Sequence, residues 1–222
     1  MGRVKSGPRA ESGAVAVEAA IVLPVLLLMI FGMIEFAFVM RDYAGVANSV
    51  RVGSRVAATG AAAGPGTCET GPDVPVCTST SSPSLAQEAA DAIQRGGSSM
   101  PGDNINYLLV YKANAAGFPG AEGITTMPTT CASTANCVKF VWRDALNAFR
   151  YSSGSWSSVS ISACFPGSTT NPLLGMHRVG IYLDATHPMM TGLFGASIHL
   201  QDRAVMNFEP LPTQSCGANQ HL

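Results

Sequence analysis

The sequence predicts an α+β fold, in which a long N-terminal transmembrane helix precedes a small, mostly antiparallel β-sheet in an exported domain. Two observations predict it: a nearly uncharged apolar segment near the N-terminus, and several short β-rich runs separated by Gly, Pro and Ser in the second half of the chain. We therefore expect a cytoplasmic leader, a transmembrane helix, an extracytoplasmic helix extension and an exported, disulfide-containing α+β domain. These parts cover residues 1–13, 14–40, 41–62 and 63–222.

The apolar segment runs from Ala14 to Met40 and carries only two charges, Glu18 and Glu35. A helix of about 20 residues crosses the ~30 Å hydrocarbon core of a bilayer, so the segment is long enough to span it. A cleaved secretory signal has an apolar region of only about 7–15 residues, so we expect a retained anchor. Pro24 removes one backbone donor inside the helix, which membrane helices tolerate when neighbouring groups satisfy the freed carbonyl.

The charges before this segment predict its orientation. Arg3, Lys5 and Arg9 precede it against a single acid, Glu11. Because positively charged flanks stay inside, we expect a single-pass protein of the cytoplasmic membrane with a cytoplasmic N-terminus and an extracytoplasmic C-terminal domain. All six cysteines follow the segment, and disulfides form in exported domains, so the cysteines predict the same orientation.

The helix is expected to continue beyond the membrane until Gly64-Pro65-Gly66 ends it. In this extension, helical periodicity separates an apolar packing face from a solvent face. The packing face comprises Tyr43, Val46, Val50 and Val56, and the solvent face Arg41, Arg51 and Arg55.

The exported domain shows one further helix and several strands. Ser84-Leu85-Ala86-Gln87 is a capping-box pattern that predicts a short amphipathic helix over 85–95. A helical turn is expected over 144–149. Apolar or alternating runs predict strands over 105–111, 138–142, 157–164, 179–183 and 198–208.

The six cysteines are candidate disulfide partners, with fifteen possible connectivities. The short separations favour Cys68–Cys77 and Cys131–Cys137, and the alternative is free, buried thiols. A metal site is disfavoured because the spacing contains no C-x-x-C and no paired histidine. The remaining candidates are Cys164 and Cys216.

The sequence lacks the patterns of a catalytic or nucleic-acid-binding protein. After residue 62, seven lysines and arginines stand against ten aspartates and glutamates, a net charge of −3 that disfavours nucleic acid as a partner. The sequence contains no G-x-S-x-G, no phosphate-binding loop and no H-E-x-x-H. We therefore predict no catalytic residue, no cofactor and no small-molecule substrate. The four histidines are interpreted as loop or strand-edge residues, and Trp142 and Trp156 as packing residues.

The most informative motif is Gly13, then Ala14, then Glu18 at the fifth position counted from Ala14. A lone carboxylate in a membrane helix costs roughly 2.5–3.5 kcal/mol on insertion scales. Cleavage between Gly13 and Ala14 would create an α-ammonium at Ala14, which Glu18 of a neighbouring subunit would neutralise. The alternative is a carboxylate near the interface that the helix dipole favours.

Further motifs follow in order along the segment and its extension: Ala16-Val17-Glu18, Val22-Leu23-Pro24, Phe31-Gly32-Met33-Ile34-Glu35-Phe36 and Arg51-Val52-Gly53-Ser54-Arg55. With the Gly13 and Glu18 pattern, the N-terminus resembles that of type IV prepilins, and over about residues 12–60 these motifs resemble those of the TadE-like proteins of the Tad (Flp) tight-adherence pilus system. A weaker resemblance covers the closing hairpin and the final Glu209-Pro210. The resemblance implies a pilin-like fold, cleavage by a prepilin peptidase, and assembly with other pilin-like subunits and the Tad inner-membrane machinery.

Two functions remain open from the sequence. The first is a minor pilin-like component that acts by helix packing in the lipid bilayer, where small residues allow close helix approach. The second is an anchored extracytoplasmic binding domain or enzyme whose helix is only a tether. The residues assigned to helix packing are Ala16, Ala19, Ala20, Pro24, Gly32 and Glu35.

Overall fold

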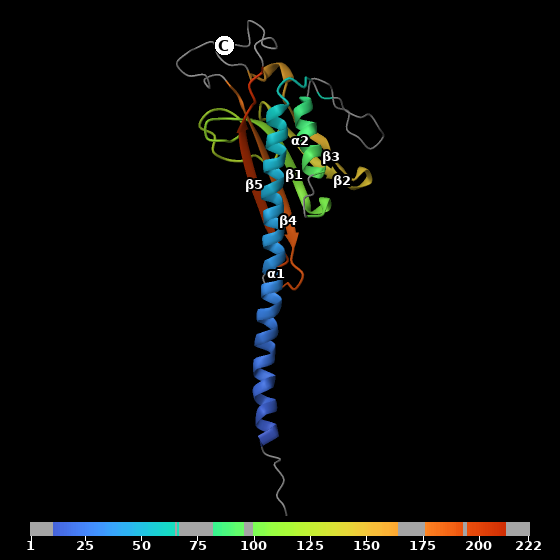
Figure 1. Ribbon diagram of the computed structural model, residues 1–222, viewed down its shortest axis with the longest axis vertical. Helices are drawn as coiled ribbons and strands as arrows, with labels where there is room; N and C mark the ends of the chain where they lie inside the picture. The colour runs from blue at the N-terminus through green and yellow to red at the C-terminus, as the bar shows by residue number, and fades with distance from the viewer. Residues whose placement is uncertain are drawn as a thin grey trace, which may run out of the picture.

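A computed structural model describes residues 11–64, 66, 82–95, 100–163, 176–192 and 195–211. It confirms the predicted α+β fold. One long helix projects as a stalk from a head that consists of a five-stranded antiparallel sheet and a second helix (Figure 1). The only described helix that is long and apolar enough to cross a membrane is this N-terminal one.

Helix α1 spans Glu11–Thr59, and its 49 residues make it about 74 Å long. Its second half packs on the head through residues spaced three or four apart, the period of a helix with one buried face. The predicted packing residues Val46 and Val50 are fully buried there, Val56 is half-buried and the predicted solvent-face arginines are exposed. Tyr43 is 47% exposed, so its predicted place on the packing face is wrong. The buried residues of α1 are Glu35, Val39, Asp42, Val46, Ser49, Val50, Gly53, Ser54, Ala57 and Ala58.

The sheet has the order β3-β2-β1-β4-β5, and every pair of neighbours is antiparallel. Each strand except β3 overlaps a run that the sequence predicted, and the run over 198–208 ends one residue beyond β5. The strands are β1 Ile105–Ala113, β2 Cys137–Arg143, β3 Ala148–Ser155, β4 Arg178–Pro188 and β5 Ser197–Asn207.

The strand predicted over 157–164 is wrong for its described residues. Ser158–Ser160 form a 3-10 turn, and the third strand instead lies earlier, at β3. The apolar residues that suggested a strand are still buried, since Ile161 and Ala163 both belong to the core. The turn predicted over 144–149 is shorter, because a 3-10 turn covers only Asp144–Leu146 before β3 begins at Ala148.

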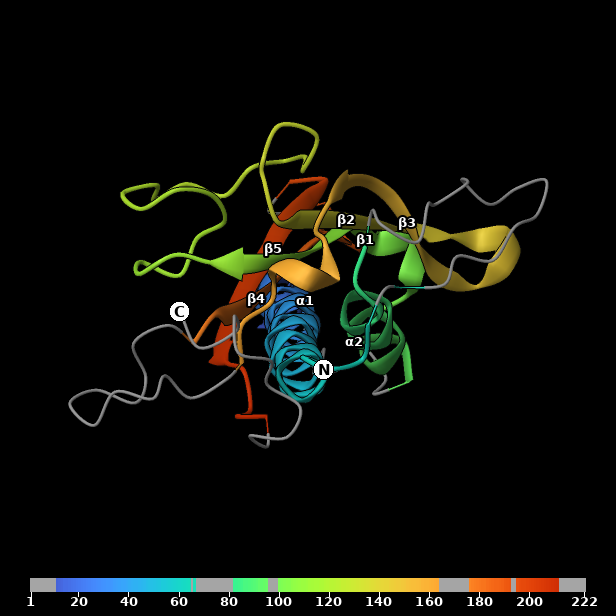
Figure 2. The same cartoon turned by 90° about the horizontal axis from the view of Figure 1, so that it is seen from above.

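Both helices cover the same face of the sheet, and the segment between β1 and β2 crosses the other face (Figure 2). Helix α2, Ser84–Arg95, confirms the predicted amphipathic helix, with Leu85, Ala89 and Ile93 buried. A bulge between Ile105 and Tyr107 changes which face the following β1 residues occupy, so that Ile105 and Leu108 both reach the main core.

The crossing of α1 and α2 depends on glycine. A Cβ at Gly60 would lie only 2.7 Å from the Leu85 Cβ and 3.3 Å from its Cα, so a side chain there would push the helices apart. A Cβ at Gly53 would also lie 2.7 Å from a neighbour, but that neighbour is the end of the Ile93 side chain. A side chain therefore has less room at Gly60 than at Gly53.

Candidate functional site

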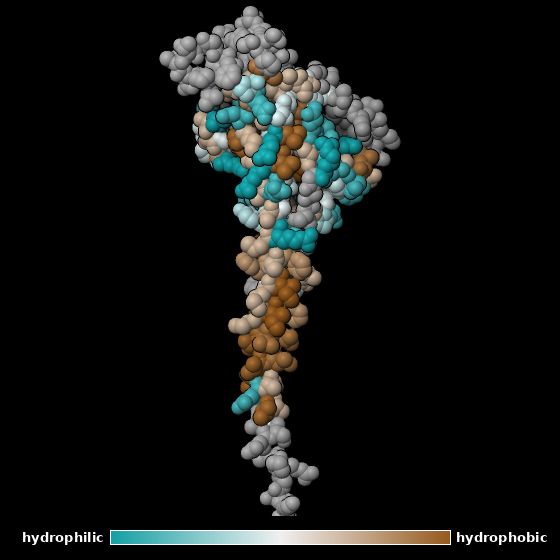
Figure 3. Space-filling model, viewed as in Figure 1, coloured by the Kyte–Doolittle hydropathy of each residue, from teal (hydrophilic) through white to brown (hydrophobic). Residues whose placement is uncertain are grey.

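The stalk half of α1 exposes a continuous apolar surface. From Val15 to Ile34 every residue of the helix is exposed except the half-buried Gly32, and none of the most apolar 18-residue window is buried. Apolar colour covers most of this stalk up to the level where the head begins, with one hydrophilic patch near its lower end, while the head surface mixes polar and apolar areas (Figure 3). A soluble protein rarely leaves so large an apolar area in water, so this surface requires lipid or other helices around it.

The predicted processing residues lie at the free end of this stalk. Gly13 lies within α1, and apart from its chain neighbours and the nearby backbone of its own helix, no described atom lies within 4 Å of the position that a Cβ would occupy there. Ala14 is the next helical residue, and Glu18 lies about one turn further on, exposed. No hydrogen bond or ion pair to Glu18 is found within the described ranges. Its neutralisation in a membrane therefore requires a group beyond those residues.

The three alanines proposed for helix packing are all exposed, while Gly32 is half-buried. Ala16, Ala19 and Ala20 lie on one side of α1, because residues three and four apart share a helix face. At about 100° per residue, Glu18 lies roughly 200° around the axis from Ala16, on the opposite side. Pro24 lies inside α1, which runs through it as one helix (Figure 1). The stalk thus offers two different faces to neighbours.

Glu35 marks the level at which α1 enters the head. The sequence left its role open; the structure buries it, with 2% of its surface exposed. Its carboxylate accepts a hydrogen bond from the Thr191 backbone N–H at 3.2 Å and another from the Thr191 hydroxyl. Thr191 belongs to the connection between β4 and β5, which is the part of the head nearest the stalk (Figure 1).

A second polar contact fastens the same hairpin to α1 two turns further on. His187, at the end of β4, donates from Nδ1 to the Asp42 carboxylate at 2.7 Å, and both side chains are nearly buried. Its Nε2 is also buried and has no hydrogen-bond partner among the described residues. We call the two contacts, Glu35–Thr191 and Asp42–His187, the hairpin clasp. The interpretation of His187 as a loop or strand-edge residue missed this partner, which is 145 positions away in sequence.

His177 makes a different contact at the start of β4. Its Nδ1 accepts from the Ser162 backbone N–H at 3.0 Å, and its Nε2 lies 2.9 Å from the Lys112 Nζ. Burial and the neighbouring Lys112 charge hold the pKa of His177 below its ordinary 6.5. Burial likewise lowers the pKa of Lys112. The neutral imidazole is therefore the form that this site favours.

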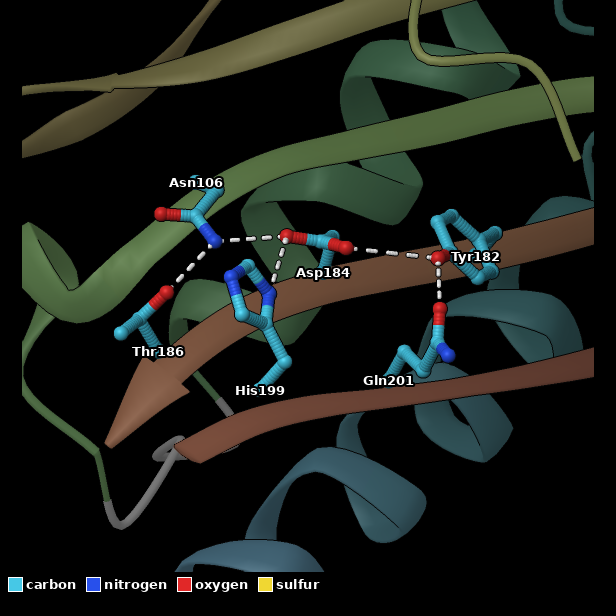
Figure 4. Close-up of polar contacts among 6 residues, drawn as sticks. All are labelled: Asn106, Tyr182, Asp184, Thr186, His199 and Gln201. Atoms are coloured by element: carbon cyan, nitrogen blue, oxygen red, sulfur yellow. Dashed lines mark hydrogen bonds and ion pairs between the residues drawn. The ribbon is translucent and has the colours of Figure 1, made fainter. Parts of the chain in front are cut away.

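The sheet face opposite the helices carries a polar network across three strands (Figure 4). Asp184 of β4 accepts from the Asn106 amide of β1 at 2.6 Å, and its carboxylate lies 3.9 Å from His199 of β5. The Tyr182 hydroxyl donates to Gln201 at 2.5 Å, and burial, Tyr107 and Asp184 raise the pKa of Tyr182, so it stays a donor. These bonds join β1, β4 and β5 in register, which is a structural role.

The segment between β1 and β2 is closed by the Cys131–Cys137 disulfide, one of the two pairings that the spacing favoured. Both cysteines are buried against Leu109, Tyr111 and Tyr182. Nearby, Lys112, Asn114 and Glu122 line an open hollow. Within the described ranges, no group of three His, Cys, Asp or Glu side chains is placed to hold a metal. The other predicted cysteines, Cys68, Cys77, Cys164 and Cys216, lie outside the described residues.

The structure defines a class: a protein with one exposed, apolar N-terminal helix of membrane-spanning length and an α+β head clasped to its far half. The family model of the TadE-like proteins matches residues 13–55, which confirms the resemblance found in the sequence. This stretch of the chain is therefore similar to the TadE-like proteins. The matched residues cover the whole exposed stalk and most of the second half of α1, which packs on the head. Neither a curated protein nor a solved structure matches the chain.

Proposed function

We propose that this protein is a Tad pilus-associated, membrane-anchored minor pilin-like component, processed by a prepilin peptidase and acting by helix packing, not catalysis. The observation that carries the proposal is the TadE-like match over residues 13–55. That stretch contains the Gly13–Ala14 pair, Glu18 and the exposed apolar surface of α1. In the proposed orientation, the leader is cytoplasmic and the head lies outside the cytoplasmic membrane.

Assembly would follow from the exposure of the stalk. Glu18 carries a charge that costs roughly 2.5–3.5 kcal/mol inside a bilayer unless it is neutralised. Cleavage after Gly13 gives each subunit a terminal ammonium at Ala14, and pairing it with Glu18 of the next subunit offsets that cost. Ala16, Ala19 and Ala20 lie on the opposite side of the helix from Glu18, where their small side chains allow a second neighbouring helix to approach closely.

The first experiment determines the mature N-terminus by mass spectrometry of protein from cells that carry the Tad machinery. We expect a start at Ala14 in the wild-type chain and uncleaved protein for Gly13→Leu. Gly7→Leu, in the same leader, is the matched control and is expected to be cleaved normally. A wild-type protein that keeps Met1 and still supports pili would refute the processing step.

A second experiment separates an assembly helix from a tether. Residues 14–34 are replaced by an unrelated apolar helix of the same length that leaves the clasp residue Glu35 in place. If packing of the stalk is the function, the exchanged protein enters the membrane but pilus production is lost. Normal pili from the exchanged protein would favour the alternative, a head domain whose helix only anchors it.

A further inference from the structure

We propose that the connection between β4 and β5 rests on the outer surface of the membrane and inserts Met190 among the lipid headgroups and upper acyl chains. The head would then have two contacts with the bilayer, the stalk of α1 and this hairpin. The inference rests on the proposed membrane anchoring of α1 and adds a lipid-binding surface on the head.

The first argument is the height of the hairpin along the stalk. Glu35 lies 21 residues after Ala14, which is about 31 Å along a helix. The hydrocarbon core is about 30 Å thick. If Ala14 lies at the inner boundary, Glu35 lies at the outer one. Because Thr191 is hydrogen-bonded to Glu35, the hairpin is held at that same level.

The second argument is the chemistry of the hairpin. The sequence from Pro188 to Ile198 contains no charged residue, although charged residues occur elsewhere in β4 and β5. Met190 is 73% exposed, the highest value among the exposed large hydrophobic residues of the described chain, and Ile198 is 39% exposed. Burial of an apolar side chain at the membrane interface is favourable, and an uncharged connection takes no charge into the interface with it.

The third argument is the position of the backbone. Beyond the hydrogen bond from the Met189 N–H to the Ala196 carbonyl, the described residues 190–192 lie outside the β-ladder. Backbone groups outside a ladder are not tolerated in the hydrocarbon region when they face lipid. At the headgroup level, water and lipid headgroups satisfy them. The Glu35 carboxylate is satisfied by Thr191, so it too lies stably at this level. If only the Met190 side chain enters the bilayer and the backbone stays at the headgroup level, the backbone groups can be hydrogen-bonded and Glu35 can keep its contact with Thr191.

The test uses the full chain in vesicles of phosphatidylcholine and phosphatidylglycerol, with a benzophenone amino acid replacing one residue at a time. Position 190 is the test. Position 31 is the positive control, since Phe31 is 47% exposed on the stalk. Position 124 is the matched control on the head, since Ile124 is 43% exposed and apolar but far from the hairpin in sequence and on the segment between β1 and β2. Adducts are identified by mass spectrometry after irradiation.

We expect lipid adducts at positions 31 and 190, with roughly tenfold fewer at position 124. Adducts at 31 but not at 190 would overturn the hairpin proposal and leave the anchoring of α1 intact. No adduct at 31 would show that the stalk is not in the bilayer, which refutes the anchoring and this inference with it. Crosslinks from 190 to a second copy of the chain in place of lipid would also overturn the inference.

Discussion

At the scale of single residues, the two acids of the stalk have opposite environments. Glu18 is exposed with no partner found within the described ranges, while Glu35 is buried and hydrogen-bonded by Thr191. Both stand out in the sequence because they are the only charges between Ala14 and Met40. The sequence alone did not separate their roles, since the partner of Glu35 lies 156 positions away.

We predict that Glu18→Gln abolishes pilus production and leaves membrane insertion intact. The amide keeps the shape of the side chain but has no charge to neutralise the terminal ammonium of a neighbouring subunit. Pili are counted by electron microscopy, and insertion is measured by membrane fractionation. Glu18→Asp, which keeps the charge, is the control and should retain part of the pili. Full piliation of Glu18→Gln would eliminate the charge-pairing step.

The clasp predicts a large effect on stability. His187→Ala leaves the nearly buried Asp42 carboxylate without its donor, and breaking such a pair costs about 3 kcal/mol. The measurement is urea unfolding of the full chain in detergent, followed by circular dichroism. His199→Ala is the matched control, since that side chain is 72% exposed and lies 3.9 Å from Asp184. If both variants changed the free energy of unfolding equally, the clasp would contribute little to stability.

His177 predicts a pH dependence of stability. Its pKa is lowered in the folded protein, so below about pH 6.5 the unfolded chain binds more protons. The contribution of His177 to stability is therefore complete above its unfolded pKa and is lost as the pH falls towards the folded pKa. Urea midpoints measured from pH 7.5 to 5 should fall less for His177→Gln than for wild type. Identical slopes would contradict the prediction.

At the scale of elements, most helices and strands with clear apolar patterns were predicted correctly from sequence, but one alternating segment was not. Helix α2 and strands β1, β2, β4 and β5 carry clear apolar patterns. Residues 157–163 alternate apolar and polar side chains, yet they pack without joining the sheet, because β3 already pairs with β2. Which segment pairs with β2 depends on contacts in the folded structure. The spacing of apolar residues within a segment does not indicate its pairing partner.

The crossing of α1 and α2 gives a prediction for one pair of glycines. Gly60→Ala should destabilise the protein by about 1–3 kcal/mol, because its Cβ would meet the Leu85 Cβ and backbone. Gly53→Ala should cost less, since its nearest neighbour is the movable end of Ile93. Thermal unfolding of both variants compares them directly. A larger loss for Gly53→Ala would show that the helices are less tightly fixed at Gly60.

At the scale of the whole molecule, the division into a stalk and a head was predicted from the sequence, but the hairpin clasp that joins them was not. The apolar segment with only two charges and the TadE-like motifs predicted a helix that leaves the head, and residues 13–55 match that family. The clasp joins residues 35 and 42 to residues 191 and 187, and no local pattern in the sequence indicates those pairs. Contacts between residues far apart in the sequence can be identified only once the fold is known.

The clasp also determines how force would pass through the molecule. Glu35 and Asp42 lie on one side of α1, two turns apart, and both are tied to the β4–β5 hairpin, which is continuous with the sheet. Two fixings along an axis remove the freedom to swivel that a single one would leave. In the proposed orientation, a push or twist applied to the helix from inside the cell would pass to the head through both contacts, so the head would move together with the upper part of α1.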